Sequence, residues 1–394
     1  MVDDPVVIVS GARTALGSFQ GVFQGVAATE LGATAIAAAV ERSRVPAAEI
    51  DEVLMGCVLP AGQGQAPARQ ASLGAGLPLG TGATTVNKMC GSGMKAAMLA
   101  HDLLLAGSAR VAVAGGMESM SSAPYLLPKV RSGQRMGNGV LVDHMFFDGL
   151  EDAYDKGRLM GTFAEDCATK FAFSRDEQDA WAIRSLERAK RANEDGSFAW
   201  EIAPVTVRDR SGERRIDRDE QPFSADPSRI PTLRPAFRKD GTVTAANSSS
   251  ISDGAAALVL MRESEAARRG IEPLARIVSH ATHAQEPGWF TTAPVHAITK
   301  VLSASGWKAS DVDLYEINEA FAVVAMASVR EHGLDPERVN VHGGACALGH
   351  PIGASGARIL VTLIAALRSR GLSRGVASLC IGGGEATAMA IDLR

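Results

Sequence analysis

The chain has 394 residues, of which 46% are hydrophobic, 21% charged and 5% aromatic, and its formal net charge is −4. This composition allows large buried cores and excludes a disordered chain or a collagen-like fibre. The 40 Lys and Arg residues nearly balance the 44 Asp and Glu residues, so no single-sign field favours a nucleic acid partner. The length predicts two or three domains.

The longest apolar stretches, such as residues 359–367, are much shorter than the roughly 20 residues of a membrane helix. The N-terminus, MVDDP, lacks the basic and apolar regions of a signal peptide. We therefore expect a cytoplasmic protein without a membrane partner. The five cysteines form no CxxC pair and the eight histidines form no HxxxH or HExxH pattern, so the sequence predicts neither disulfides nor a metal site.

Predicted strands and helices alternate in the first third of the chain. The strands are expected at residues 5–11, 50–56, 84–87 and 111–114, and the main helices at residues 29–44 and 90–106. This alternation predicts an α/β layered domain.

The last third repeats that order. A helix at residues 295–305 precedes predicted strands at residues 312–318, 339–341 and 376–381, with a long helix before the last strand. Two similar α/β halves are indicated, and a chance likeness between two generic α/β segments is the alternative.

Residues 121–246 differ in composition, with more charged residues, prolines and glycines, and look like an inserted region. One helix is well signalled there, because residues 174–177 form a capping box ahead of apolar residues at helical spacing. The mixed-charge run at residues 208–215 indicates a solvated surface rather than a phosphate site.

Cys90 lies where a predicted strand meets a predicted helix. A helix N-terminus lowers the pKa of a thiol, so this position suits a reactive thiolate, although taken alone it fits buried filler equally well. Gly91 and Gly93 would leave the sulfur unobstructed. The same glycines formally match a dinucleotide fingerprint, but the acidic residue that this fingerprint requires is missing at the end of the next strand.

Three further residues carry possible chemistry. His350 lies between glycine and proline in a glycine-rich turn, which favours an acid–base role. Cys380 precedes three glycines whose amides could bind an oxyanion, and the amide of Asn318 could position a water or a carbonyl. All three, with Cys90, follow predicted strands, at the edge where α/β sheets bind ligands.

Together these residues identify a family. The chain resembles the thiolases through six motifs in order: SGART at 10–14, NKMCGSG at 87–93, GGMESM at 115–120, NEAF at 318–321, GHP at 349–351 and CIGGG at 380–384. The resemblance implies duplicated βαβαβαββ halves that form a five-layered α-β-α-β-α core with an inserted loop domain. It divides the chain into residues 1–120 with 247–270, the loop domain 121–246 that covers the CoA site, and residues 271–394.

The resemblance also implies residue roles. Cys90 would carry the acyl group as a thioester, His350 would accept its proton, and Cys380 would be the acid/base. Asn318 would hold a water at one oxyanion site, and the N–H groups of Cys90 and Gly382 would form the other. No metal or redox cofactor is implied.

Contacts with acyl-CoA are implied at seven positions: Leu159, Met160, Phe237, Ala245, Ser249, Ala320 and Phe321. The chain departs from the usual family pattern at Leu159, His342, Ser250 and Ala386, and the arginine often seen near the CoA adenine is replaced in residues 219–223. Leu159 stands where short-chain members often have histidine, which makes the pocket less polar.

The expected reaction is reversible condensation of two acetyl-CoA to acetoacetyl-CoA and CoA, with thiolysis of longer 3-ketoacyl-CoA in fatty acid β-oxidation as the close alternative. A decarboxylating ketosynthase would carry histidine in place of Cys380. A Cys/His/Asn hydrolase would leave Cys380 unexplained, and a non-catalytic acyl-CoA- or lipid-binding relative would not need the full set. Residues 125–149 resemble the arm that joins tetramers, so we expect a homotetramer rather than a dimer.

Overall fold

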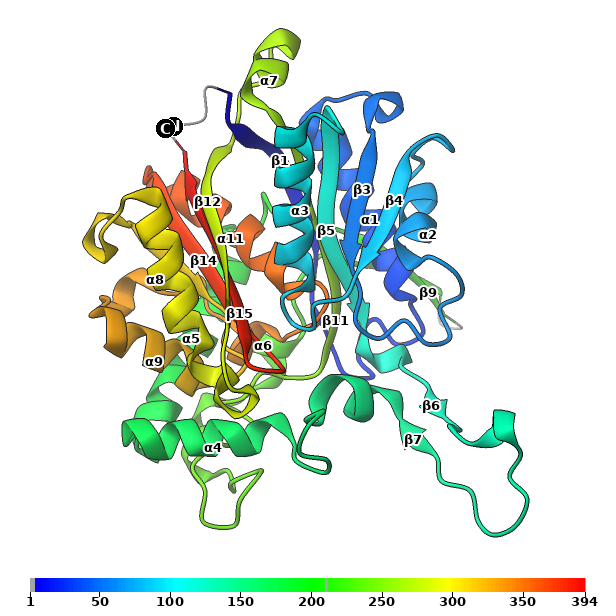
Figure 1. Ribbon diagram of the computed structural model, residues 1–394. Coiled ribbons are helices and arrows are strands. Elements are labelled where there is room, and N and C mark those ends of the chain that lie inside the picture. The colour runs from blue at the N-terminus through cyan, green and yellow to red at the C-terminus, as the bar shows by residue number, and fades with distance from the viewer. Residues whose placement is uncertain (1–3, 210–211, 394) are drawn as a thin grey trace.

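The chain is organised by two sets of strands with the same spatial order. The computed structural model describes residues 4–209 and 212–393. The N-terminal half has the order β4-β3-β5-β11-β1, and the C-terminal half has the order β13-β14-β15-β12 (Figure 1). In the second half, Val339 forms a single bridge with Tyr315 of β13. This bridge takes the position that β4 has beside β3 in the first half. The repeat of the α/β half predicted from the sequence is thus confirmed.

The strands of the first half are β1 (Val6–Thr14), β3 (Glu52–Gly56), β4 (Gly82–Val86), β5 (Val111–Ser119) and β11 (Ser252–Arg262). Those of the second half are β12 (Ala275–Ala284), β13 (Leu314–Ile317), β14 (Arg374–Ile381) and β15 (Glu385–Asp392). In each half the crossover-connected strands pair in parallel and the remaining pairs are antiparallel.

The two sheets meet at a short junction. β1 and β12 are antiparallel and pair only through Val7 with Arg276 and Ile8 with Ala275. The halves are therefore held together mainly by side-chain packing rather than by a long ladder of backbone hydrogen bonds.

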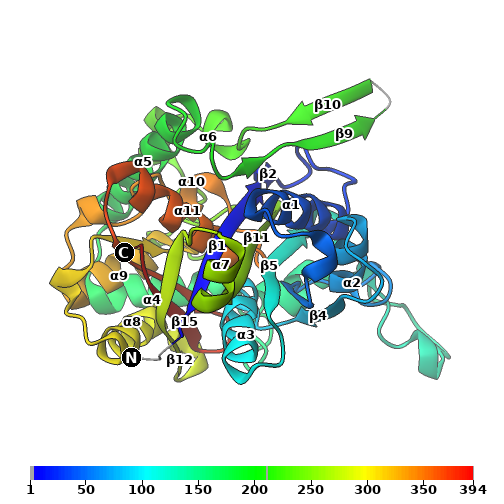
Figure 2. The ribbon, with the colours of Figure 1, turned by 90° about the horizontal axis from the view of Figure 1, so that it is seen from above.

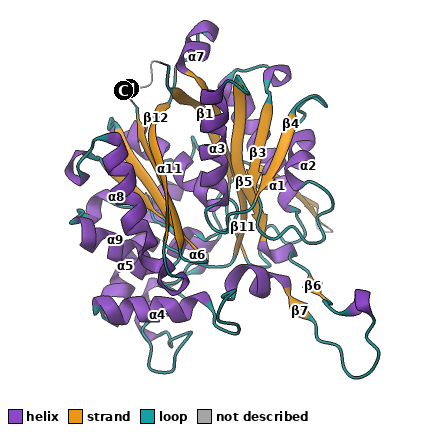
Figure 3. Cartoon of the chain, viewed as in Figure 1, coloured by secondary structure: helices purple, strands orange, loops and turns teal. Residues whose placement is uncertain are grey.

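Two helices form the layer between the sheets, α3 (Ser92–Ala106) and α11 (Ser355–Arg370). They share one apolar core with side chains from both sheets, including Ile8 and Leu379. All residues of α11 from 355 to 367 are buried, as expected for a helix surrounded by protein. Figure 3 shows both helices between the two groups of strands.

Helices also cover the outer face of each sheet. In β1, Val7 and Val9 alternate with Val6 and Ile8, so one pair packs under the outer helices and the other faces the central layer. The outer helices are α1 (Ala28–Ser43) and α2 (Pro67–Gly74) on the first half, and α8 (Ala293–Ser305) and α9 (Ala322–His332) on the second. The predicted five-layered α-β-α-β-α architecture is confirmed.

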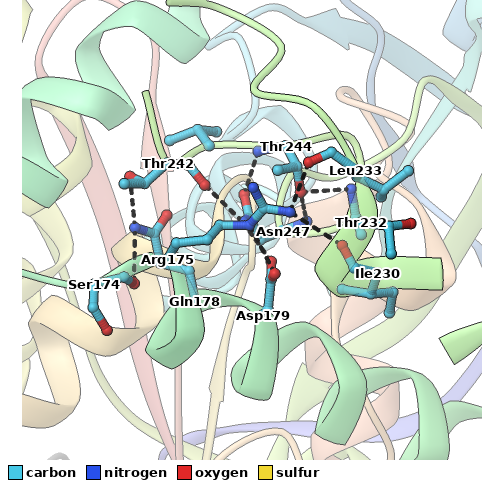
Figure 4. Close-up of polar contacts among 12 residues, drawn as sticks. Ser174, Arg175, Gln178, Asp179, Ile230, Thr232, Leu233, Thr242, Thr244 and Asn247 are labelled. Atoms are coloured by element: carbon cyan, nitrogen blue, oxygen red, sulfur yellow. Dashed lines mark hydrogen bonds and ion pairs between the residues drawn. The ribbon is translucent and has the colours of Figure 1, made fainter. Parts of the chain in front are cut away.

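The middle region adds α4 (Met160–Phe171) and α5 (Arg175–Glu194) beside the second half. The capping box predicted for α5 is present, since Ser174 accepts a hydrogen bond from the Glu177 backbone. Arg175 donates to the carbonyls of Ile230 and Leu233, and so ties α5 to the segment around residues 227–233 (Figure 4).

The shorter elements of the chain are β2 (Gly17–Ser18), β6 (Tyr125–Leu126), β7 (Val142–Asp143), β8 (Ile202–Ala203), β9 (Val205–Asp209), β10 (Gly212–Ile216), α6 (Gln221–Ser224), α7 (Glu263–Arg269) and α10 (Ala345–Leu348). Two arms project from the molecule, the hairpin β9–β10 and the segment around β6 and β7, as Figure 2 shows.

Two local predictions need correction. The strand expected at residues 339–341 is wrong, because only Val339 forms a bridge and the chain then enters a turn around Asn340, whose φ is +50°. The helix expected from Cys90 begins at Ser92. Among the described residues, no helix has both the length and the apolar character required to cross a lipid bilayer.

Candidate active site

A cavity of about 260 Å³ opens where strands of both halves end, and the middle region contributes part of its wall. It collects most of the positions predicted from the sequence: Cys90, His350, Cys380, Gly382, Leu159, Met160, Phe237, Ser249, Ala320 and Phe321. Ala245 instead lines a neighbouring pocket beside Leu186 and Ile230. Asn318 is buried and does not line the wall.

A strained turn presents Cys90 to the cavity. Met89, the preceding residue, has a φ of +47°, which is unfavourable for a side chain with a Cβ. Three hydrogen bonds hold this turn. Asn87 Oδ1 accepts from the Met89 N–H at 3.0 Å, while Ser92 Oγ donates to the Met89 carbonyl at 2.6 Å and accepts from the Lys88 N–H at 2.8 Å.

The thiol of Cys90 has a high pKa. Burial raises it to about 11, although the backbone N–H groups of Gly382 and of Cys90 itself act in the opposite direction. The raised pKa differs from the depressed thiol pKa expected from the helix N-terminus, because desolvation outweighs the two backbone donors. The thiol is protonated at rest, and the two N–H groups near its sulfur are suited to hold a negative charge that develops there.

His350 is held as a neutral base. Its Nδ1 lies 2.6 Å from Ser355 Oγ, and that hydroxyl donates to the Pro351 carbonyl at 2.9 Å. Since a hydroxyl has one proton to give, Nδ1 must be the donor to Ser355, which leaves Nε2 unprotonated. Nε2 is buried and has no hydrogen-bond partner in the protein. Burial, together with the charge of Arg358, lowers the pKa of His350 to about 3.

Cys380 lies near the end of β14, before the glycines, and is 1% exposed. Burial raises the pKa of its thiol well above the ordinary value, and a negative charge on Cys90 raises it further. The two thiols are thus close enough to influence each other's ionisation.

Asn318 directly follows β13 and is 1% exposed, yet neither its amide nitrogen nor its carbonyl oxygen has a protein partner. Its neighbours are fixed instead. Asn340 accepts from the Ile317 N–H at 2.8 Å and donates to the Ile317 carbonyl at 2.9 Å and to Glu319 at 2.8 Å. A rigidly held, unpaired buried amide has the chemistry required to bind a water or a ligand oxygen.

Glu319 anchors the same loop from the other side. Its carboxylate accepts from Trp181 Nε1 at 2.9 Å, Ser185 Oγ at 2.7 Å and the Cys346 N–H at 3.2 Å. The sequence analysis did not select Glu319 or Asn340, because their partners lie on segments far apart in the chain.

Glu118 was also missed, although it lies within the GGMESM motif. Its carboxylate accepts from the N–H groups of Val58 at 2.9 Å, Leu59 at 3.1 Å and Gly353 at 2.9 Å. Burial raises its pKa to about 7. The residue joins the loop after β3 to the turn that follows His350.

Glycines let the two central helices approach at the site. A Cβ at Gly93 would lie 2.8 Å from the Ala357 nitrogen and 3.1 Å from the Gly353 carbonyl oxygen, and a Cβ at Gly356 would collide with the backbone of Met94. The start of α3, next to Cys90, therefore lies directly against the start of α11, next to His350.

Comparison with known proteins agrees with this geometry. The family described as "Thiolase, N-terminal domain" matches residues 6–264, and "Thiolase, C-terminal domain" matches residues 271–393. The chain belongs to the thiolase family. An acetyl-CoA acetyltransferase of Rhizobium meliloti is 51% identical to this thiolase over 393 residues, with 100% of both chains covered.

Two eukaryotic relatives are similar over the same length. A protein named acetyl-CoA acetyltransferase from Schizosaccharomyces pombe is 48% identical over 394 residues and covers 100% of both chains. Acetyl-CoA acetyltransferase 2 of Arabidopsis thaliana is 51% identical over 392 residues, which is 98% of this thiolase and 97% of the relative.

The four single-residue departures from the family pattern have different surroundings. Leu159 lines the cavity. The Ser250 carbonyl accepts from the His350 N–H at 3.1 Å, and Ala386 pairs with Cys380 between β14 and β15. His342 is buried edge-on against Phe198, and burial lowers its pKa to about 4. Only the first of these side chains lines the reaction cavity of this thiolase.

Proposed function

We propose that this thiolase catalyses the reversible Claisen condensation of two acetyl-CoA to acetoacetyl-CoA and CoA. The observation that carries the proposal is a single cavity lined by Cys90, His350 and Cys380, with the N–H groups of Cys90 and Gly382 at the sulfur. The names of the full-length relatives support acetyl-CoA as the substrate.

In the first half-reaction, the Cys90 thiol gives its proton to Nε2 of His350 and attacks the thioester carbonyl of acetyl-CoA. The new carbon–sulfur bond forms on Cys90 as the bond to CoA breaks. The departing CoA thiolate takes the proton of Cys380 and leaves as free CoA. His350 is then positively charged and Cys380 is a thiolate, so the total charge is unchanged.

In the second half-reaction, the Cys380 thiolate removes a proton from the α-carbon of a second acetyl-CoA. The raised pKa of this thiol makes its thiolate a strong base. The carbanion attacks the acyl group on Cys90 and forms the new carbon–carbon bond. The Cys90 sulfur leaves and recovers its proton from His350, which returns all three residues to their starting states.

Oxyanions develop in both steps and require fixed donors. The N–H groups of Cys90 and Gly382, which act on the Cys90 sulfur, would hold one of them. A water held by the unpaired amide of Asn318, together with His350, would hold the other.

The size of the cavity favours a short acyl chain. Its volume of about 260 Å³ lies below the roughly 300–1,000 Å³ of pockets for larger ligands. The apolar Leu159 is the observation that favours the alternative, thiolysis of longer 3-ketoacyl-CoA in fatty acid metabolism.

We assign the pantetheine arm of CoA to the cavity wall made by Met160, Phe237, Ser249, Ala320 and Phe321. The rings of Phe237 and Phe321 meet edge-to-face, with centroids 6.0 Å apart. The neighbouring pocket, lined by Ala245 and Arg229, would take a more distal part of CoA. In this proposal residues 121–246 form the loop domain over the CoA site, between the half made by residues 1–120 with 247–270 and the half made by residues 271–394.

No metal or redox cofactor enters these steps, because the reaction transfers an acyl group and protons without net oxidation. We expect full activity after prolonged dialysis against EDTA. Loss of activity that added metal restores, in a protein that circular dichroism shows to be still folded, would contradict this part of the proposal.

We further propose a homotetramer assembled through the arm around β6 and β7. The arm carries several exposed apolar side chains: Tyr125, Leu127, Val130, Met136, Val140 and Leu141. Light scattering should give the mass of four chains, and replacing residues 127–141 by a short Gly/Ser linker should reduce it to that of two. An unchanged mass would overturn this role of the arm.

A cytoplasmic location fits the proposed chemistry, because Cys90 and Cys380 react as free thiols and a reducing compartment preserves them. Cell fractionation tests this expectation. Recovery of the protein mainly from an oxidising compartment would contradict it.

The deciding experiment measures thiolysis of acetoacetyl-CoA by free CoA, with intact-mass analysis of the acyl-enzyme. We expect rapid turnover in the wild type and a loss of about 10²–10⁴-fold in both Cys90→Ser and Cys380→Ser. Incubation with acetyl-CoA should acetylate Cys380→Ser but not Cys90→Ser. A wild type that hydrolyses the substrate without using CoA, or that prefers longer substrates strongly, would reject the proposal.

A further inference from the structure

Outside the reaction cavity, three potential metal ligands meet between the two halves. His101 and Asp102 lie on α3, and His280 lies on β12, two elements that run side by side in Figure 1. His101 Nδ1 lies 3.0 Å from Asp102 Oδ1, and His280 Nε2 lies 3.2 Å from His101 Nδ1 and 3.0 Å from Asp102 Oδ1. The three atoms form a nearly equilateral triangle.

Hydrogen bonds alone do not satisfy this triangle. Each ring nitrogen has one in-plane position, which holds either a proton or a lone pair. If both nitrogens are protonated, two N–H groups face each other across 3.2 Å. If only His280 is protonated, the lone pair of His101 faces the Asp102 carboxylate at 3.0 Å. If only His101 is protonated, the lone pair of His280 faces the same carboxylate oxygen at 3.0 Å. One contact is repulsive in each of these states.

A cation in the triangle removes the conflict, because all three atoms can then direct lone pairs inward. Zinc binds His nitrogen and Asp oxygen at about 2.0–2.2 Å, so two ligands of a tetrahedral ion are separated by roughly 3.3–3.5 Å. The observed separations of 3.0–3.2 Å need only a slight expansion to reach this value. We propose that His101, Asp102 and His280 bind one divalent transition-metal ion of the zinc type.

The surroundings suit this role. The two histidine side chains are 14% and 18% exposed, whereas that of Asp102 is 53% exposed and leaves a route for the ion and for a water ligand. Lys95 is the cation that opposes binding from α3.

The location indicates a structural purpose. α3 belongs to the first half and begins two residues after Cys90, while β12 belongs to the second half. A bound ion would join the halves through side chains, next to the region where only two residue pairs of β1 and β12 join them through the backbone. The site would stabilise the fold and take no part in the acyl-transfer steps.

The test uses the full-length Cys90→Ser/Cys380→Ser protein, which lacks the active-site thiols that also bind zinc. We expect titration calorimetry to show about one equivalent of Zn²⁺, and Co²⁺ to give the visible absorption of a tetrahedral ion. His101→Gln and His280→Ala should each weaken binding by at least about tenfold. Zinc should also raise the melting temperature of the parent and not that of His280→Ala.

His283→Ala is the matched control, because His283 lies three residues further along β12 and its ring is 4.6 Å from that of His296. This variant should bind zinc as the parent does. Asp102→Asn removes the charged ligand with little change in shape and should also lower the affinity. Equal zinc binding by the parent and by His280→Ala, or no cobalt absorption, would overturn the proposal. Circular dichroism shows whether each variant is folded.

Discussion

The Ser355 hydroxyl determines which nitrogen of His350 is basic, because it accepts from Nδ1 at 2.6 Å and gives its own proton to the Pro351 carbonyl. Ser355→Ala removes this acceptor and allows the other tautomer. We expect kcat to fall by about 10²-fold with a smaller change in KM. Ser369→Ala is the control, because Ser369 lies on the same helix and bonds only to a carbonyl of that helix. Equal kinetics in the two variants would disprove the role of Ser355.

His350 also makes stability depend on pH. Its pKa is lowered to about 3 in the folded protein, mainly by burial, and is about 6.5 in the unfolded chain. As the pH falls through this window, the unfolded chain takes up a proton that the folded protein rejects. The unfolding free energy should therefore fall by about 1.4 kcal/mol per pH unit from this group.

His350→Asn removes that titration. Urea unfolding of both proteins between about pH 4.5 and pH 5.5 should show a steeper loss of stability in the wild type by about 1.4 kcal/mol per unit. Parallel curves would mean that His350 is already protonated in the folded state.

The apolar character of Leu159 suits longer acyl chains, but the bulk of its side chain is expected to limit their length, because it lines the cavity. Leu159→Ala should raise kcat/KM for the six-carbon 3-ketoacyl-CoA relative to acetoacetyl-CoA by about tenfold, which is the usual value of a small change in apolar contact. The ratio of the two constants is measured by thiolysis. An unchanged ratio would place the limit elsewhere on the wall.

Gly93 allows α3 and α11 to touch, so Gly93→Ala should push the helices apart. The new Cβ would lie 2.8 Å from the Ala357 nitrogen, and we expect a loss of about 1–3 kcal/mol in stability together with reduced activity. Gly80→Ala is the control, since a Cβ there has no atom within 4 Å. Thermal unfolding of both variants tests this, and similar melting temperatures would contradict the close contact.

The apolar run of β1 was predicted from the sequence, whereas β11 was missed although its residues 255–261 also form a continuous apolar run. β15 was missed because three of its six buried residues are alanine, which has a low strand propensity. β12 was missed because it is only half-buried and mixes histidine, serine and threonine with apolar residues. The expectation at residues 339–341 failed because the β-branched pattern there forms one bridge before a turn.

Residues of the candidate site could be found where glycines mark them, as at Cys90, His350 and Cys380. Their supports could not, because Ser355, which fixes the His350 tautomer, looks like any serine at the start of a helix. The high pKa of Cys90 was also missed, since desolvation depends on the whole fold. The roles of the site residues and the domain boundaries stay predictions until the variants are measured.

The sequence search for a metal site used spacings within one helix, and the proposed ligands do not follow them. His101 and Asp102 are adjacent in the chain, and His280 is 178 residues beyond Asp102. Only the packing of α3 against β12 brings the three together.

The contact between the starts of α3 and α11 constrains how the two halves of the chain can evolve. One duplicated half supplies Cys90 and the other supplies His350 and Cys380, so neither half retains a complete reaction centre. The two copies have become complementary parts of one catalyst, and a change that shifts either helix by a fraction of an ångström must be matched in the other copy.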